Sequence, residues 1–135
     1  MRIRKPGVLF LCVHNAGRSQ MAAGFMRQFS DMAVFSGGSE PASSLNPAAV
    51  AAMHERGIDV SQYVPQRWTM ELLESVDVVV TMGCGDECPF IPGKKYIDWP
   101  LTDPAGQGLE MVRGVRDEIE QKVKLLAAEL LNDQR

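Results

Sequence analysis

The sequence lacks any strong excess of charge. Its 14 Lys and Arg residues face 17 Asp and Glu residues, giving a net charge of −3 at pH 7, and it contains no like-charge block, internal repeat or low-complexity tract. A domain that binds phosphate backbones usually carries a basic face, so we expect no nucleic-acid partner. With 135 residues, 45% of them hydrophobic, the chain is long enough to bury one core, and we expect a single domain over residues 1–135.

Long hydrophobic runs are also missing. Basic residues occur within the first six positions, but the apolar run that follows covers only residues 8–13 and is interrupted by Cys12. Such a run is too short for the hydrophobic part of a signal peptide and far too short to cross a bilayer. We therefore expect a buried strand here, a cytoplasmic protein and no membrane partner.

Cysteine and histidine are scarce. The three cysteines stand at positions 12, 84 and 88, and an odd number cannot all pair within a disulfide framework. In a reducing compartment, cysteines more often serve catalysis, redox chemistry or metal binding than structure, although a free cysteine can also be a small buried apolar residue. Zinc binding by Cys84 and Cys88 with His14 or His54 is disfavoured, because C-x3-C is an unusual zinc spacing and the histidines are scattered. We expect no metal and no cofactor.

Strand-like and helix-like segments alternate along the chain. Apolar and β-branched runs predict four strands, at residues 7–11, 33–36, 76–82 and 95–98. Apolar spacing and capping residues predict four helices: one starting near Arg18, one capped by Asn46 and ended by Gly57, a short one capped by Thr69, and a last one over residues 109–130. This order is typical of an α/β fold, a doubly wound four-stranded parallel sheet with helices on both faces.

Three residues with reactive side chains come at or shortly after the ends of predicted strands. Cys12 follows the first strand, Cys84 the third and Asp103 the fourth. In open parallel sheets, ligands bind beyond the carboxyl ends of the strands. We therefore expect these three residues at the same edge of the sheet.

The loop from Cys12 to Arg18 runs from a strand end to a helix start. A loop there can turn successive N–H groups toward one point, beside the positive end of the helix dipole, and so bind a tetrahedral oxyanion. The expected oxyanion-binding residues are Val13, His14, Asn15, Ala16, Gly17 and Arg18. The same field favours the thiolate form of Cys12, Arg18 can contact two oxygens at once, and Ser19 is placed to donate to the thiolate.

The alternative is that Cys12 is only a buried residue at a strand end and Arg18 a solvated arginine at a helix start. That alternative fits poorly, because a positive charge at a helix N-terminus opposes the helix dipole unless an anion lies there. The sequence therefore favours a catalytic Cys12.

Residues 12–22 resemble the phosphate-binding loop of the low-molecular-weight protein tyrosine phosphatase superfamily and are most similar to its arsenate reductase branch. Matching motifs recur at residues 36–42, 46–47, 57–61, 80–84 and 98–106, so the resemblance covers nearly the whole chain. It implies the fold of that superfamily, and a role for Asp103, which precedes Pro104, as general acid for the leaving oxygen. That role serves both phosphate ester cleavage and the release of water from arsenate.

Cys84 and Cys88 separate reduction from hydrolysis. A hydrolase needs one thiol, because water resolves the phosphocysteine, whereas a reductase must obtain two electrons with the help of a second thiol. The resemblance implies that Cys12 forms a thiol-arsenate adduct, that Cys84 attacks Cys12 and releases arsenite, and that Cys88 then attacks Cys84. Thioredoxin, or a related dithiol carrier, would reduce the resulting disulfide. The expected substrate is arsenate, with phosphate and sulfate as analogues.

Two other activities stay open. One is phosphotyrosine phosphatase with incidental cysteines, although the loop after residues 76–82 lacks the adjacent tyrosines with which such phosphatases grip an aromatic substrate. The other is arsenate reduction coupled to mycothiol and a mycoredoxin, which needs no resolving pair. Related thioredoxin-linked proteins often carry a glutamate that helps bind potassium. This chain has Ala23 at that position, so we expect no potassium site. The sequence is compatible with a monomer and with a homodimer.

Overall fold

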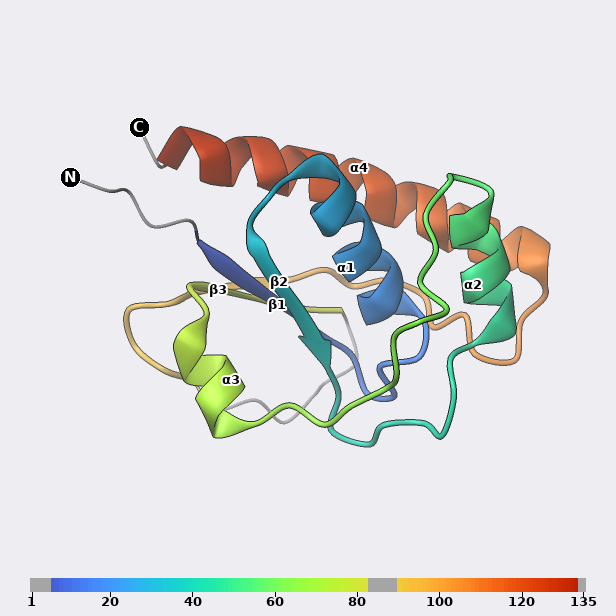
Figure 1. Ribbon diagram of the computed structural model, residues 1–135, viewed down its shortest axis with the longest axis horizontal. Helices are drawn as coiled ribbons and strands as arrows, with labels where there is room; N and C mark the ends of the chain where they lie inside the picture. Colours follow the sequence, from blue (N-terminus) through green and yellow to red (C-terminus); the bar gives the residue numbers. More distant parts are fainter. Residues whose placement is uncertain (1–5, 83–89, 134–135) are drawn as a thin grey trace.

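Parallel strands form the centre of the molecule. A computed structural model describes residues 6–82 and 90–133, and within these ranges four strands form one sheet: β1 (Gly7–Leu11), β2 (Ala33–Gly37), β3 (Val78–Thr81) and β4 (Lys95–Asp98). Their order is β2-β1-β3-β4 and every neighbouring pair is parallel, so that β1 and β3 are central (Figure 1). The predicted four-stranded parallel sheet is confirmed.

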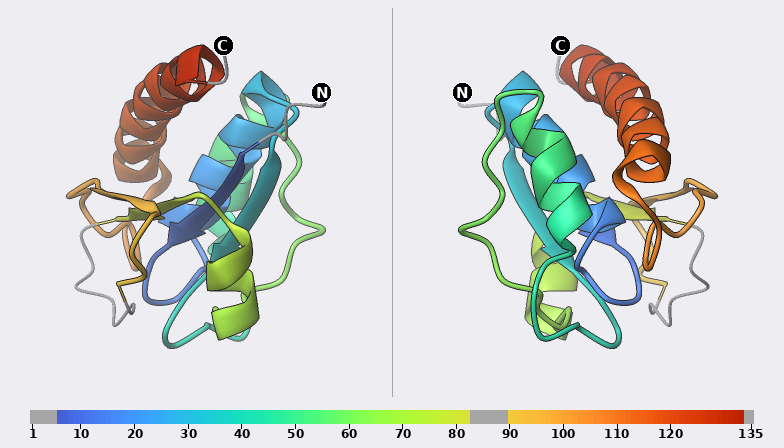
Figure 2. Two further views of the ribbon diagram at one scale, coloured as in Figure 1. Left: turned by 90° about the vertical axis from the view of Figure 1, so that its left-hand side faces the viewer. Right: turned by 90° about the vertical axis from the view of Figure 1, so that its right-hand side faces the viewer.

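Helices within the same residues cover both faces of the sheet, as predicted (Figure 2). α1 (Arg18–Phe29), α2 (Pro47–His54) and α4 (Leu109–Asp133) lie on one side, where α1 and α2 both pack against α4. α3 (Met70–Ser75) lies on the opposite side. Among the described residues, no helix is both long and apolar enough to cross a membrane.

β1 is buried along its whole length, which explains its continuous apolar sequence. Val8 and Phe10 point into the larger core beneath α1, α2 and α4, whereas Leu9 and Leu11 point into the smaller core beside α3. Successive residues of a strand face opposite sides of the sheet, so a strand covered on both faces needs an apolar residue at every position. The central strand therefore places the residue that follows it, Cys12, at a fixed point of the carboxyl edge.

α2 begins where the sequence predicted and ends at His54, three residues before the predicted stop at Gly57. The Asn46 side chain accepts a hydrogen bond from the Ala48 N–H at 2.9 Å, and Pro47 is the first helical residue. Gly57, just beyond the end of α2, has a φ of +75°, which glycine adopts without strain.

α3 is capped by Thr69, whose hydroxyl oxygen accepts from the Leu72 N–H at 3.1 Å. Val76 then ends this helix in an extended conformation, and β3 starts only at Val78. The predicted strand over residues 76–82 was therefore too long at its start, because its first residue belongs to the end of a helix.

α4 buries the apolar stripe that its sequence predicted. Five residues of the stripe are buried: Val112, Ile119, Val123, Leu126 and Leu130. Leu109, at the start of the helix, is only partly buried. Two i,i+4 ion pairs also form in this helix, with Glu118 to Lys122 at 4.0 Å and Glu120 to Lys124 at 3.9 Å.

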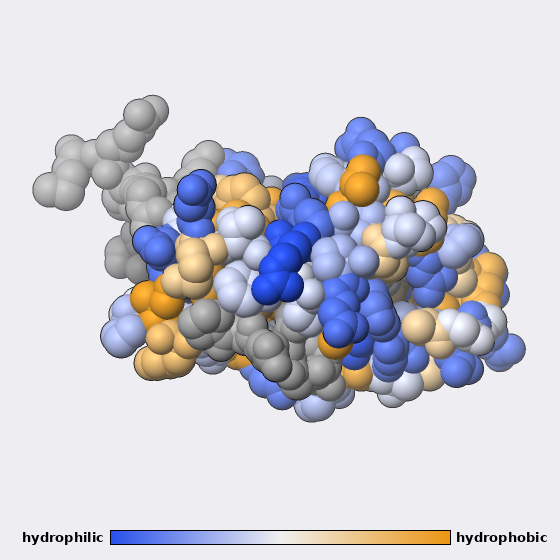
Figure 3. All heavy atoms as spheres, turned by 90° about the horizontal axis from the view of Figure 1, so that it is seen from below, coloured by the Kyte–Doolittle hydropathy of each residue, from blue (hydrophilic) through white to orange (hydrophobic). Residues whose placement is uncertain are grey.

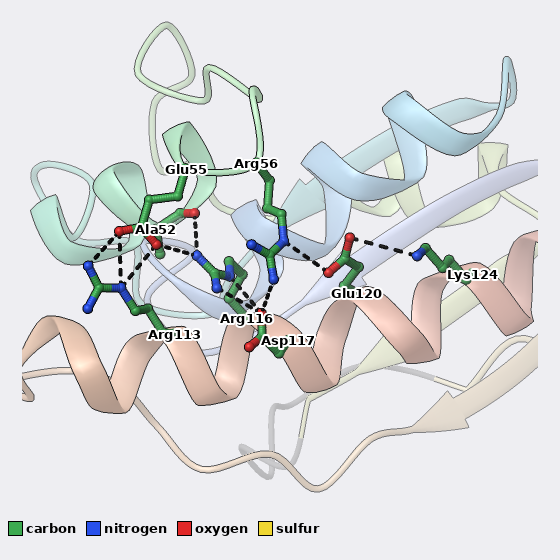
Figure 4. A network of polar contacts seen from close by, with 8 residues as sticks. All are labelled: Ala52, Glu55, Arg56, Arg113, Arg116, Asp117, Glu120 and Lys124. Carbon is green, nitrogen blue, oxygen red and sulfur yellow. Dashed lines mark hydrogen bonds and ion pairs between the residues drawn. The ribbon is translucent and has the colours of Figure 1, made fainter.

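A network of charged side chains joins the end of α2 to α4 (Figure 4). Glu55, directly after α2, accepts hydrogen bonds from Arg113 Nη2 and from Arg116 Nη1, each at 2.6 Å. Arg116 is 4% exposed, and the same Nη1 atom also donates to the Ala52 carbonyl at 2.9 Å. These contacts fix the C-terminal end of the helix whose N-cap, Asn46, lines the candidate site.

Candidate active site

The loop after β1 lies at the carboxyl edge of the sheet and runs over residues 12–17, beside the segment of residues 38–46 (Figure 1). Hydrogen bonds of 2.9 Å tie its carbonyl oxygens to that segment: Glu40 N–H to Val13, Ala42 N–H to His14, and Asn46 N–H to Ala16. In a trans peptide, the carbonyl and the following N–H point in opposite directions. The N–H groups of His14, Asn15 and Gly17 are therefore turned to the inner side of the loop, as an oxyanion-binding loop requires.

Gly38 allows the close approach between the loop and this neighbouring segment. A Cβ atom at this position would overlap the carbonyl oxygens of Cys12 and Val13. The Gly38 N–H also donates to the Gln66 carbonyl at 2.9 Å, which ties a third segment to the same place. In the sequence, Gly38 belonged only to the matching motif at residues 36–42; the available signal was a glycine pair directly after the predicted strand, where close backbone approach is common.

Cys12 is 2% exposed, and its Sγ lies 2.9 Å from Ser19 Oγ. Ser19 Oγ is also 2.6 Å from Asn15 Nδ2. An amide nitrogen can only donate, so the serine oxygen accepts there and its own hydrogen is free to point at Sγ. The structure thus brings Ser19 to Cys12 in the donor arrangement that the sequence suggested.

Asn15 holds a turn that few residues accept. Its φ is +50°, in the left-handed region that asparagine tolerates better than other residues with a side chain. Its Oδ1 accepts from the backbone N–H of Gln66 at 3.0 Å, although 51 positions separate the two residues. The loop shape is therefore fixed partly from outside the loop.

Arg18 points into the site and is not a solvated arginine. It is 5% exposed, and its Nη1 donates to the Met82 carbonyl at 2.8 Å and to the Leu101 carbonyl at 3.2 Å. These two acceptors follow β3 and β4, so the ends of two strands orient one guanidinium group. The alternative in which Arg18 is a solvated residue at a helix start is wrong, because the fold buries it.

Asp103 lies beside Arg18 at the mouth of the site. Its Oδ2 is 3.7 Å from Arg18 Nη2, and its Oδ1 accepts from the Ala105 N–H at 3.0 Å. Half of its side chain is exposed, in contrast to Arg18. One carboxylate oxygen is thus held by the turn, while the other faces the arginine.

These side chains line a small cavity of about 50 Å³. Its lining residues are Cys12, His14, Ala16, Gly17, Arg18, Asn46, Asp103, Pro104 and Ala105. Sites for drug-sized organic ligands are typically about 300–1,000 Å³, so this cavity suits a small inorganic anion. Seen from below, the face onto which these loops open carries hydrophilic residues across its middle (Figure 3). Asn46 is a lining residue that the sequence indicated only as a helix cap.

Two predicted site residues, Cys84 and Cys88, lie outside the described residues. Met82 is the last described residue before them in the sequence. It is fully buried, and its carbonyl accepts a hydrogen bond from Arg18. Within the described ranges, no group of three or more His, Cys, Asp or Glu side chains could hold a metal ion. Ala23, at the position where we expected no potassium site, is fully buried.

The chain is similar to known proteins over nearly its whole length. Residues 7–135 match the family described as low molecular weight phosphotyrosine protein phosphatase. An arsenate reductase of Halalkalibacterium halodurans is 39% identical, over 93% of this chain and 97% of that protein. A glutaredoxin arsenate reductase of Synechocystis is 38% identical, over 91% of this chain and 97% of that protein.

A solved structure of an arsenate reductase is also similar to this chain. It is the thioredoxin-dependent arsenate reductase of Corynebacterium glutamicum, with a TM-score of 0.84 and 37% identity over 98% of this chain. This chain spans 64% of that longer protein. Together with the family match, the likeness shows that the chain belongs to the low molecular weight phosphotyrosine protein phosphatase family.

Proposed function

We propose that this protein reduces arsenate to arsenite, with Cys12 as the nucleophile. The observation that carries the proposal is the cavity of about 50 Å³ in which the Cys12 thiol, the Arg18 guanidinium and the Asp103 carboxyl meet. A cavity of this size fits a tetrahedral oxyanion and leaves no room for an organic substrate inside it. Relatives that are 38–39% identical over nearly the full chain are named arsenate reductases, which favours arsenate over other oxyanions.

In the first step, the inward N–H groups of His14, Asn15 and Gly17 and the Arg18 guanidinium bind the arsenate oxygens, and Cys12 Sγ attacks arsenic. The sulfur–arsenic bond forms as one oxygen leaves, and that oxygen departs as water once it is protonated. Asp103 Oδ2 is the proton donor, since it faces the cavity beside Arg18 while Oδ1 stays bound to Ala105. Ser19 holds the attacking sulfur by its hydroxyl, 2.9 Å away.

In the second step, Cys84 attacks Cys12. The sulfur–arsenic bond breaks, its electron pair stays on arsenic as arsenite, and a Cys12–Cys84 disulfide forms. Cys88 then attacks Cys84, which frees Cys12. The length of the intervening chain supports an attack by Cys84 first. The Met82 carbonyl contacts Arg18 at 2.8 Å, and the two residues from Met82 to Cys84 span at most about 7 Å.

Thioredoxin, or a related dithiol carrier, then reduces the Cys84–Cys88 disulfide by thiol–disulfide exchange. Such a cycle needs reduced thiols and therefore a cytoplasmic setting. Similar proteins use either carrier: the Corynebacterium protein is thioredoxin-dependent, and the Synechocystis protein is a glutaredoxin arsenate reductase. Thioredoxin is the carrier that we propose, with glutaredoxin and mycothiol with mycoredoxin as the other donors to be compared.

The test is arsenate-dependent oxidation of thioredoxin by the purified protein. We expect turnover by the wild type and none by Cys12→Ser or Cys84→Ser, whereas Cys88→Ser should accumulate a Cys12–Cys84 disulfide after one turnover. Normal turnover by Cys84→Ser with thioredoxin would refute the relay. Rapid hydrolysis of an aryl phosphate with negligible arsenate reduction would instead assign the protein to the phosphatases.

A further inference from the structure

We propose that Gln20 is a positioning residue, which fixes Asn15 and through it the hydroxyl that Ser19 offers to Cys12. The proposal rests on the proposed role of Cys12 as the nucleophile. Gln20 lies in the first turn of α1 and is 1% exposed, so it touches no bulk solvent and does not line the cavity. It acts only through its neighbours.

The direction of the hydrogen bonds that lead to Cys12 is set at their far end. The backbone N–H of Gln66 can only donate, and it donates to Asn15 Oδ1 at 3.0 Å. The other end of the Asn15 amide, Nδ2, must then donate to Ser19 Oγ, at 2.6 Å. Ser19 then keeps its hydroxyl hydrogen for Cys12 Sγ, 2.9 Å away, and donates to the sulfur when Cys12 is a thiolate. If the Asn15 amide were reversed, Ser19 would donate to Asn15 and Sγ would face oxygen lone pairs.

Gln20 holds the one residue in this series whose conformation is unusual. Its Nε2 donates to the backbone oxygen of Asn15 at 3.0 Å and to Asn15 Oδ1 at 3.2 Å. One amide group thus joins the side chain of Asn15 to its own backbone, at a φ of +50°. The contact restrains both the left-handed turn and the orientation of the Asn15 amide.

The other end of the Gln20 side chain indicates that this contact has a use. Gln20 Oε1 is buried, and it has no hydrogen-bond partner among the described residues. A buried amide oxygen without a partner destabilises the folded state, and an apolar side chain of similar size would avoid that loss. The residues next to it in α1, Met21 and Ala22, are fully buried and apolar. A glutamine in this setting is therefore expected for the donor that it supplies rather than for stability.

The test compares Gln20→Met with the wild type by the rate at which iodoacetamide alkylates Cys12, followed on the Cys12 peptide by mass spectrometry. We expect the rate at neutral pH to fall roughly fivefold, the effect of one lost hydrogen bond, and the pH profile of alkylation to move to higher pH. The thermal midpoint should change little, because the substitution removes the unpartnered Oε1 together with the two hydrogen bonds that Nε2 donates. A structural role would instead lower stability and leave the pH profile in place, and that result would overturn the proposal.

Two further variants make the comparison decisive. Gln28→Met, on the exposed face of the same helix, should alkylate at the wild-type rate. In a Ser19→Ala background, Gln20→Met should have no further effect, because its influence passes through Ser19. An additive loss in the double variant would overturn the proposal, and Gln20→Leu replaces Gln20→Met if the latter does not fold. Alkylation reports thiol reactivity whatever the reaction, so arsenate reduction by Cys12→Ser would refute the proposed function without bearing on this measurement.

Discussion

At the scale of single residues, the candidate site depends on groups that are oriented by contacts from distant parts of the chain. Arg18 is held by carbonyl groups that follow β3 and β4, and Asn15 is held by the backbone of Gln66. Each contact removes freedom from a side chain that must meet an anion or a thiolate. Such preorganisation places donors before the substrate arrives, which is the main way a fixed site stabilises developing charge.

Gly38 is the residue whose substitution should affect this arrangement most directly. We expect Gly38→Ala to lower the free energy of unfolding by about 3 kcal/mol, because a Cβ would overlap two carbonyl oxygens of the loop and force them apart. Urea unfolding measures the effect. Gly114→Ala is the matched control: Gly114 lies in α4 with open space around its Cβ position, so the change should stabilise by about 1 kcal/mol. Equal effects of the two substitutions would contradict the close approach.

Asp103 should matter for rate and little for stability. We expect Asp103→Asn to slow arsenite release in a single turnover about 100-fold, because the amide cannot supply the proton that the leaving oxygen needs. Its side chain is half exposed, so the free energy of unfolding should change by less than about 0.5 kcal/mol. Rapid-quench measurement of arsenite, alongside urea unfolding, separates the two. An unchanged rate would remove Asp103 from the proposed mechanism.

At the scale of elements, the sequence predicted what depends on local pattern. The four strands, apart from the start of β3, and the Asn46 and Thr69 caps were predictable, since each depends on residues a few positions apart. The positions of Gln20, Gln66 and the Met82 carbonyl at the site were not, because these contacts join segments that only the folded sheet brings together. The start of β3 was predicted two residues too early. Val76 is β-branched, as strand residues often are, but it caps the end of α3.

The join between α2 and α4 gives a pH prediction. Hydrogen bonds from Arg113 and then Arg116 lower the pKa of Glu55 from 4.5 to about 2. A carboxyl group whose pKa is lowered by folding contributes stability that is complete above about pH 5 and is lost as the pH falls toward 2. We expect Glu55→Gln to be less stable than the wild type at pH 7, and the difference to shrink steadily between pH 5 and pH 2.

Urea unfolding at a series of pH values measures this difference. Glu118→Gln is a suitable control, because Glu118 is exposed and its ion pair with Lys122, at 4.0 Å, is a long one within α4. That variant should follow the wild type at every pH. If the loss of unfolding free energy in Glu55→Gln did not depend on pH, Glu55 would stabilise the protein through packing and not through its charge.

At the scale of the whole molecule, the sheet brings the loop after β1 and the segments after β3 and β4 together at one edge, where Arg18 contacts the Met82 and Leu101 carbonyls. The order β2-β1-β3-β4 puts β1 and β3 side by side at the centre, so that the residue following β1 and the segment following β3 start next to each other. This topology is what makes a relay from Cys12 to Cys84 geometrically reasonable, although the two lie 72 positions apart in the sequence.

The most direct test of the central claim is a disulfide map after a single exposure of the reduced protein to arsenate, without any carrier. We predict one arsenite released per chain, a Cys84–Cys88 disulfide and a free Cys12 thiol, as read by differential alkylation and peptide mass spectrometry. Phosphate in place of arsenate should leave all three thiols reduced. Arsenite released without any disulfide, or three free thiols and no arsenite, would contradict the three-thiol account.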